Sequence, residues 1–466
     1  MKGTVLKGDG FFLADDGTMT AQSDNLAAIF TPRSVAVIGA SSSPEKLGFQ
    51  ILKNIRDAGF KGPIYPVNPK ATSILDLRCF PSIADVDGAP ELAVIIVPAG
   101  TVPATLAACG AKGVKGAIVI SGGFSESGAE GESLQRQALE VARANKIRMV
   151  GPNCQGVNNP YHGLCASWPL LTMQGAMAVV SQSGTVAAAL MDWAAQEGIG
   201  VSALVSMGNR ADVDEADLLE YFDGDAQTRA IALYIEGVKD GPRFLAAARR
   251  ARKPIVVLKP GRTEKGRQAA ESHTKSLAGR DEVYQGAFRQ FGICRAETLH
   301  ELYDFSKALA YLRRPSGRKV LFVTSSGGCG VLAADVAAGE GLDVAPLPEA
   351  VATHLRSFLP RHFVVNNPLD LTGDATAKLY KEVIAVAKDA FDIVTVIFGD
   401  PIVGASEVID RHRPELVVFL GGAEVEREEG RRLHARGVPV FPTPERGMRA
   451  LAQLVRFGRP EEKARP

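Results

Sequence analysis

One pattern occurs three times along the chain, at intervals of roughly 140 residues. Each copy is a short, continuous run of apolar residues that leads into a turn rich in glycine and serine, and then into a segment of helical character. Uninterrupted apolar strands that alternate with helices are typical of parallel sheets covered on both faces. The sequence therefore predicts an α/β protein of three doubly wound parallel-sheet domains. The copies occupy residues 34–43, 176–184 and 319–328.

The spacing of the copies also places the domain boundaries. The chain has 466 residues, which is enough for two to four domains of ~100–200 residues each. We expect an N-terminal extension at 1–23, followed by domains at 24–165, 166–315 and 316–466.

Composition excludes several classes of protein. With 53 Lys and Arg against 52 Asp and Glu, the net charge is +1, so there is no basic excess for binding nucleic acid. The first residues lack the apolar segment of a secretory signal, and no apolar run approaches the ~18 residues of a membrane span. The six cysteines form no CxxC pair, so neither a zinc site nor a disulfide framework is indicated. We therefore expect a soluble, cytoplasmic protein with reduced thiols and no metal site.

The glycine and serine turns predict anion sites. A turn from a strand into a helix points backbone N–H groups and the positive helix end at one spot. The first turn, after Gly39, lacks the GxGxxG spacing of dinucleotide sites, and Lys70 stands where a nicotinamide site carries an acidic residue. A lysine there suits a ribose that bears a phosphate, as in NADP or coenzyme A. An NADP-linked oxidoreductase is thus one alternative, which the missing glycine spacing disfavours.

Nine segments in a fixed order connect the chain with a known family. From about residue 30 to about 450, the chain resembles the nucleoside-diphosphate-forming acyl-CoA synthetases, specifically the α subunit of ADP-forming acetate–CoA ligase, and more distantly succinyl-CoA synthetase. The resemblance implies a Rossmann-like CoA-binding domain, a flavodoxin-like domain with a phosphorylatable histidine, and a second flavodoxin-like ligase domain. The segments are IGAS, VNPK, ISGGFSESG, GPNCQG, SQSG, GNRADVDEADLLEYF, YIEGVKDGPRF, KPIVVLKPGR and SHTKSLAG.

The resemblance assigns roles to individual residues. His273 matches the phosphohistidine and Glu236 its acidic partner. An imidazole nitrogen is nucleophilic at neutral pH, and its bond to phosphorus stays reactive enough to pass the group onward. Ser181, Ser183 and Gly184 are expected to hold the phosphoryl group at a helix N-terminus, although Ser183 also fits an N-cap and the two roles are compatible. The residues expected to bind CoA are Gly39, Ser41, Ser42, Lys70, Val97, Pro98, Ser121, Asn153 and Gly156, the last two near its thiol.

Two further features bear on activity. The chain has no P-loop and no additional ~200 residues for a nucleotide-grasping module, so ATP or ADP and Mg²⁺ are expected on a separate ATP-grasp β subunit in a hetero-oligomer. The substrate would be a small carboxylic acid or its CoA thioester. Lys275 departs from the family pattern, which has glycine there. It can tune the histidine segment, or mark a CoA-binding regulatory or scaffold protein that has lost phosphoryl transfer, and both readings stay open. No catalytic role follows for the turn-rich segment 367–373.

Overall fold

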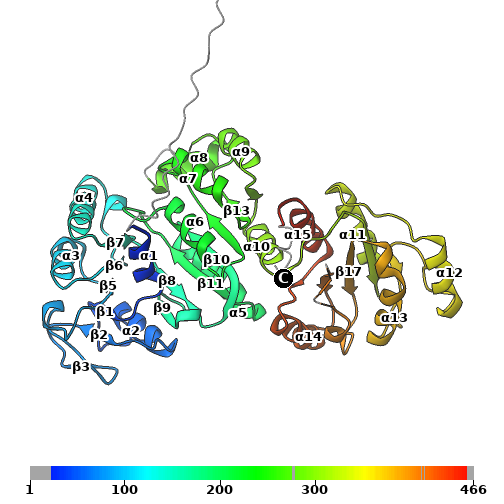
Figure 1. Cartoon of the computed structure of the whole chain (residues 1–466), viewed down its shortest axis with the longest axis horizontal. Coiled ribbons are helices and arrows are strands. Elements are labelled where there is room, and N and C mark those ends of the chain that lie inside the picture. The colour runs from blue at the N-terminus through cyan, green and yellow to red at the C-terminus, as the bar shows by residue number, and fades with distance from the viewer. Residues whose placement is uncertain (1–21, 275–278, 411, 414, 459–466) are drawn as a thin grey trace, which may run out of the picture.

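The computed structural model describes residues 22–274, 279–410, 412–413 and 415–458, except for the side chains of 22–25 and 270–274. It contains three open sheets, each flanked by helices, with the second sheet between the other two (Figure 1). The prediction of three α/β units is confirmed. Each of the three repeated apolar runs becomes an inner strand of its own sheet: β1 (Val35–Ile38), β10 (Gln174–Ser181) and β15 (Val320–Thr324).

The first sheet is parallel and has the strand order β2-β1-β5-β6-β7. Every residue of β1, β5 and β6 is buried, which explains their continuous apolar sequences. Helices α1 and α2 pack on one face of the sheet, and α3 and α4 pack on the other. The remaining elements are β2 (Ile64–Val67), β5 (Leu92–Ile95), β6 (Gly116–Val119), β7 (Arg148–Val150), α1 (Gln22–Phe30), α2 (Leu47–Asp57), α3 (Val102–Ala111) and α4 (Ala129–Ala144), with a small hairpin of β3 (Ser73–Ile74) and β4 (Leu77–Arg78).

The second sheet has the order β14-β13-β12-β10-β11-β8-β9. Its first five strands are parallel, whereas β8 and β9 form an antiparallel hairpin against β11. The predicted boundary at 165 therefore cuts through this sheet, because β8 precedes that position and β9 spans it. Its elements are β8 (Gly156–Asn159), β9 (Leu164–Ala166), β11 (Val201–Ser206), β12 (Ala230–Tyr234), β13 (Ile255–Leu258), β14 (Cys294–Ala296), α5 (Gly184–Glu197), α6 (Glu215–Gly224), α7 (Gly241–Arg250), α8 (Glu264–Thr274), α9 (Asp281–Gln290) and α10 (Leu299–Tyr311).

The third sheet is parallel in the order β16-β15-β17-β18-β19. All six residues of β17 are buried, as its continuous apolar sequence predicts. The elements are β16 (Leu369–Asp370), β17 (Ile393–Phe398), β18 (Glu415–Phe419), β19 (Val440–Phe441), α11 (Gly327–Gly339), α12 (Glu349–Phe358), α13 (Ala377–Ala387), α14 (Ala423–Ala435) and α15 (Pro444–Phe457).

The parallel strands of all three sheets follow one topology. In each sheet the first parallel strand lies between the second and the third, so β1 separates β2 from β5, β10 separates β11 from β12, and β15 separates β16 from β17. The direction of winding reverses beside that first strand. Open α/β sheets bind ligands in the crevice at this reversal, beyond the carboxyl ends of the strands. The topology thus gives each unit one favoured place for a ligand.

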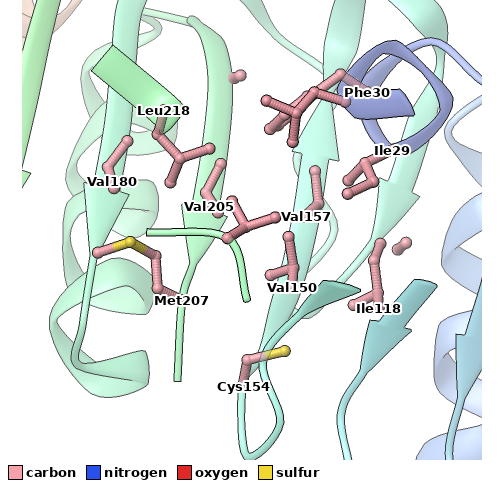
Figure 2. Close-up of a cluster of buried hydrophobic side chains, with 14 of the residues drawn as sticks. Ile29, Phe30, Ile118, Val150, Cys154, Val157, Val180, Val205, Met207 and Leu218 are labelled. Carbon is pink, nitrogen blue, oxygen red and sulfur yellow. The ribbon is translucent and has the colours of Figure 1, made fainter. Parts of the chain in front are cut away.

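Continuous hydrophobic cores join the units. Figure 2 shows Ile118 and Val150 of the first sheet in the same cluster as Val157, Val180 and Val205 of the second. A second cluster joins α5 and α10 to α11, α15 and the third sheet. Apolar side chains of the second unit therefore pack directly against apolar side chains of both neighbouring units.

Buried charges accompany the second of these cores. The ammonium of Lys307 on α10 is fully buried and lies 2.8 Å from Oε2 of Glu197 at the end of α5. Asp304, also on α10, accepts two hydrogen bonds from Arg446 of α15, at 2.6 and 2.9 Å. Because unpaired buried charges are costly, these contacts fix how the second and third units pack. Among the described helices, none is both long and apolar enough to cross a membrane.

Candidate active site

The first turn requires its glycine. Gly39 follows β1 with a φ of +91°, and a Cβ there would lie 2.3 Å from the carbonyl oxygen of Ile96. No side chain fits between these backbones, so the ends of β1 and β5 meet closely at the predicted CoA edge. Ser41 is buried and accepts a hydrogen bond from the N–H of Ser43 at 3.1 Å, while Ser42 is exposed.

Asn68 connects the first turn to the turn after β2. Its Nδ2 donates to the carbonyl of Ala40 at 2.7 Å, and its Oδ1 accepts from the N–H of Lys70 at 2.8 Å. The side chain of Lys70 is exposed at this edge. The backbone of Lys70 is thereby joined to the turn after β1, and a cation at this edge suits the phosphate end of a long ligand.

The turns after β5 and β6 continue the same edge. Ser121 Oγ donates to the carbonyl of Val97 at 2.5 Å, so this hydroxyl fixes the Val97 backbone. Val97 is half-buried and Pro98 is exposed, so the two offer an apolar strip beside the polar turns. An edge with a cation at one end and an apolar strip further along matches a phosphorylated ligand with an aliphatic arm.

The GPNCQG turn ends the first sheet. Asn153 is exposed, adopts a φ of +58° and donates its N–H to the carbonyl of Ser121 at 2.9 Å. Gly156 begins β8, where a Cβ would lie 1.9 Å from the carbonyl oxygen of Ala166. Cys154 is buried, and this burial raises the pKa of its thiol to about 12. The thiol is therefore no nucleophile at neutral pH.

The turn after β10 forms the N-terminus of α5. Ser183 is the N-cap, and its Oγ accepts from the N–H of Val186 at 3.4 Å. Ser181 is fully buried, and its Oγ donates to the carbonyl of Ser183 at 2.7 Å. The Ser181 hydroxyl thus helps to fix the shape of the turn. The first N–H groups of α5, which begins at Gly184, have no carbonyl acceptors within the helix and can bind an anion.

Glu236 follows β12, next to that turn, and is 9% exposed. Its N–H donates to Oε1 of Gln182 at 2.7 Å, and the N–H of Gly237 donates to the same oxygen at 3.4 Å. Nε2 of Gln182 donates to the carbonyl of Gly237 at 2.9 Å and to the carboxylate of Glu215. One amide thus joins the anion turn to the segment that carries the predicted acid. Sequence reasoning gave Gln182 no role, although it stands inside the SQSG motif.

Arg210 belongs to the same hydrogen-bond network, because it contacts Glu215 and Gly237. It is 8% exposed, and Nη1 lies 2.5 Å from Oε1 of Glu215 and 2.7 Å from the carbonyl of Gly237. The ammonium of Lys239 donates to the carbonyl of Arg210 at 2.8 Å. Burial lowers the pKa of Lys239, and the charge of Arg210 lowers it further. The GNRAD segment, quoted only for the resemblance, therefore holds the acid-bearing segment in place.

His273 is the penultimate residue of α8. Its side chain, and residues 275–278 with Lys275, lie outside the described part of the chain. The backbone is helical up to Thr274. The physical reason is a run of good helix formers, in which Glu264 accepts hydrogen bonds from Arg267 at 2.7 Å and from Gln268 at 2.9 Å.

The edges of the first and second units meet at Gln155. A Cβ on Gly184 would lie 3.0 Å from Cδ of Gln155, so the GPNCQG turn touches the start of α5. Nearby, Nδ2 of Asn209 donates to Oε2 of Glu126 at 2.5 Å and to Oε1 of Gln135 at 2.9 Å, which links the second unit to the first. The predicted thiol end of the CoA edge and the turn after β10 therefore lie next to each other.

In the third unit, the side chain of Asn367 holds a loop against the sheet. Oδ1 of Asn367 accepts from the N–H of Phe322 at 3.0 Å, and Nδ2 donates to the carbonyls of Val320 and Ala345, both at 2.8 Å. Both N–H groups of this amide and one lone pair of its oxygen are thus used to fix the loop against β15. The segment 367–373 has a structural role here.

Three family models match the chain in the order of its three units. They are described as a CoA binding domain (residues 33–160), a succinyl-CoA ligase like flavodoxin domain (174–309) and a ligase-CoA domain (320–443). Together they cover most of the described residues.

Similar proteins match over nearly the whole chain. The α subunit of acetate–CoA ligase (ADP-forming) I from Pyrococcus furiosus is 42% identical over 93% of this chain and 98% of its own length. Acetate–CoA ligase (ADP-forming) I from Archaeoglobus fulgidus is 39% identical over 94% of this chain, which spans 64% of that protein. Among solved structures, dinucleotide forming acetyl-coenzyme A synthetase 1 from Ca. Korarchaeum cryptofilum, in complex with phosphate and ADP, is 37% identical. It matches with a TM-score of 0.86 over 93% of this chain and 96% of that one.

Proposed function

The chain belongs to the family of ADP-forming acyl-CoA synthetases, among the relatives of the α subunit of ADP-forming acetate–CoA ligase, and from this membership we propose that it is the α subunit of such an enzyme. The enzyme interconverts acyl-CoA, ADP and phosphate with a carboxylic acid, CoA and ATP. An acyl phosphate and a phosphohistidine at His273 are its intermediates. A separate ATP-grasp β subunit supplies the nucleotide and Mg²⁺ site.

One observation carries this proposal. The GPNCQG turn, at the end of the predicted CoA edge, touches the N-terminus of α5, where a Cβ on Gly184 would lie 3.0 Å from Gln155. A thioester delivered along the first edge would arrive beside an anion site suited to phosphate. Placing two reactants side by side supplies much of the rate enhancement that acyl transfer requires.

The first step is acyl transfer to phosphate. A phosphate oxygen attacks the thioester carbonyl, the carbon–sulfur bond breaks, and CoA leaves as a thiolate that takes up a proton. The free N–H groups at the start of α5 and the helix dipole hold the phosphate. Gly39, Ser42 and Lys70 bind the phosphorylated end of CoA, while Val97 and Pro98 line its aliphatic arm.

The second step moves the phosphoryl group to His273. A ring nitrogen attacks phosphorus, the bond from phosphorus to the acyl oxygen breaks, and the carboxylate leaves. Glu236 accepts a hydrogen bond from the other ring nitrogen, which orients the ring and stabilises its cationic form. The β-phosphate of ADP on the partner subunit then attacks the phosphohistidine and ATP forms. Such transfers depend on positioning and charge neutralisation more than on further covalent chemistry.

Labelling tests the proposal. The chain and an ATP-grasp β subunit are incubated with γ-labelled ATP, and the expected product is an acid-labile, alkali-stable label on the chain. His273→Ala should remove the label, whereas His354→Ala, a change at an exposed position on α12 of the third unit, should keep it. If an active partner labels neither the wild type nor the control while calorimetry still detects CoA binding, the chain is a CoA-binding regulatory protein and the proposal is wrong.

A further inference from the structure

Tyr284 on α9 lies between two segments of the candidate site. Its hydroxyl accepts a hydrogen bond from the N–H of Val238 at 3.2 Å, and Val238 belongs to the acid-bearing segment, residues 236–238. Its ring lies against Gly279, where an added Cβ would meet Cε2 at 3.0 Å and the hydroxyl oxygen at 3.7 Å. Gly279 ends the histidine-bearing segment, residues 260–279. One side chain therefore contacts both segments.

The same ring also lies beside the start of the histidine-bearing segment. The ammonium of Lys259, the first residue after β13, lies 5.0 Å from the centre of the Tyr284 ring. Lys259 is 1% exposed, and its Nζ donates to the carbonyl of Pro260 at 2.8 Å. A cation at this distance from an aromatic face is attracted to it, and more strongly where water is excluded. Tyr284 thus contacts the residue that precedes the segment as well as the glycine that ends it.

These contacts lie at the edge of the second sheet that carries the anion turn. β12 and β13 are adjacent and parallel, so Glu236 and Lys259 follow neighbouring strand ends. On its other side, β12 pairs with β10, whose end at Ser181 leads into the anion turn. Open α/β sheets bind their ligands at this edge. Tyr284 therefore fixes the histidine-bearing segment where a phosphoryl group would be bound.

Core packing does not explain the hydroxyl of this tyrosine. The Tyr284 ring meets the ring of Phe288 edge to face, with 5.8 Å between the ring centres, and a phenylalanine would make the same contact. The hydroxyl adds only a polar contact, to the N–H of Val238. A phenylalanine would take this acceptor away from the acid-bearing segment. The hydroxyl and the ring thus act on different segments.

We propose that Tyr284 is a positioning residue for phosphoryl transfer, which holds both ends of the histidine-bearing segment beside Glu236. The proposal rests on the acyl-CoA synthetase function proposed above and adds a residue to its second step. Tyr284 acts through His273 and Glu236, and it exchanges no atom or proton with the substrate. A ring nitrogen of His273 must meet a phosphorus atom held at the start of α5, and a displacement of about 1 Å slows such a transfer roughly a hundredfold.

Two substitutions at Tyr284 test this inference. Tyr284→Phe removes the hydroxyl and keeps the ring, whereas Tyr284→Leu also removes the contacts of the ring. The chain, with an excess of an ATP-grasp β subunit, is labelled at a series of concentrations of γ-labelled ATP. The maximal labelling rate should fall about threefold to tenfold in Tyr284→Phe and about a hundredfold in Tyr284→Leu. The ATP concentration that gives half of this rate should not change, because the nucleotide binds the partner.

Tyr311→Phe is the matched control. The hydroxyl of Tyr311 also accepts from a backbone N–H, that of Ala176 at 2.9 Å, and it donates to the carbonyl of Gly200 at 3.0 Å. These contacts lie at the amino ends of β10 and β11, the edge opposite the anion turn. The control should lower the thermal midpoint at least as much as Tyr284→Phe does, because it loses two hydrogen bonds. Its labelling rate should equal that of the wild type.

The outcomes separate the possible failures. Labelling is measured below the thermal midpoint of every variant, so that unfolding does not contribute. Wild-type rates in both Tyr284 variants overturn this inference alone, and so does an equal loss of rate in Tyr284→Phe and Tyr311→Phe, which would mark a general effect of destabilisation. If Tyr284→Leu does not fold, the two phenylalanine variants decide. Absence of label in the wild type overturns the proposed function and this inference with it.

Discussion

Gln182 holds Glu236 by its backbone, since the Glu236 N–H donates to Oε1 of Gln182 at 2.7 Å. The same amide reaches Gly237 and Glu215, so it connects three segments of the second unit. The carboxylate proposed to orient His273 therefore depends on a side chain from the neighbouring strand end.

Gln182→Leu should slow the labelling of His273 by ATP about tenfold to a hundredfold, because the Glu236 segment loses its support and a displacement of ~1 Å has an effect of this size. CoA affinity, measured by calorimetry, should stay the same, since the hydrogen bonds of the Gln182 side chain go to Glu236, Gly237 and Glu215 and to none of the residues expected to bind CoA. Gln196→Leu on the surface of α5 serves as the control. Unchanged labelling kinetics in Gln182→Leu would show that the amide has no part in positioning the acid.

Gly39→Ala should weaken CoA binding and destabilise the chain by about 2 kcal/mol or more. Its φ of +91° is unfavourable for alanine, and the new Cβ would lie 2.3 Å from the carbonyl oxygen of Ile96. Calorimetry with CoA and urea unfolding measure the two effects. Gly224→Ala is the control, because a Cβ there meets no atom within 4 Å. Equal CoA affinity in the wild type and Gly39→Ala would remove this turn from the CoA site.

His434 should make stability depend on pH in the acid range. Burial, together with the charge of Lys307, lowers the pKa of His434 to about 4. The ring is neutral, with Nδ1 donating to the carbonyl of Glu197 and Nε2 accepting from the N–H of Val440 at 3.2 Å. Because the unfolded chain binds this proton at higher pH, the contribution is complete above pH 6.5 and is lost as pH falls towards 4.

This loss amounts to about 3 kcal/mol of unfolding free energy. Urea unfolding at a series of pH values should show the slope in the wild type and a flatter profile in His434→Gln. The exposed His354→Gln should keep the wild-type slope. A wild-type profile that is flat between pH 4 and 6.5 would contradict the prediction.

Glu415 should make the unfolding free energy decrease as pH rises, which is the opposite of the effect of His434. Burial, together with the charge of Asp410, raises the pKa of Glu415 to about 7. Its stabilising contribution is complete below the unfolded pKa of about 4.5 and is lost as pH rises through 7. Glu415→Gln should therefore raise the unfolding free energy at pH 8 by about 2 to 3 kcal/mol relative to its effect at pH 4. Glu424→Gln, at an exposed position, should not.

The pattern of apolar residues was enough to predict those strands that are buried on both faces of a sheet. β17, with six buried residues, reads directly from the sequence as a strand. The hairpin of β8 and β9 does not, because Asn158 and Asn159 interrupt the apolar pattern, although Asn158 is fully buried. The boundary at 165 follows from that omission.

The residues of the candidate site also divide into those that local sequence predicts and those that it does not. Gly39 and Ser183 could be placed from local sequence, because their roles depend on neighbours in the same turn. Gln182 could not, since the residue it supports is 54 positions away. Arg210 likewise acts on Gly237, 27 positions further along. Such contacts exist only once the parallel strands have come together.

The hairpin of β8 and β9 has a practical consequence for dissecting this protein. A fragment ended at residue 165 would carry away β8 and most of β9, and its partner fragment would expose the bare edge of β11. Exposed strand edges recruit other chains, so both pieces should aggregate. A fragment that contains the first unit alone should end before Gly156. A fragment that contains the second and third units should begin at Gly156.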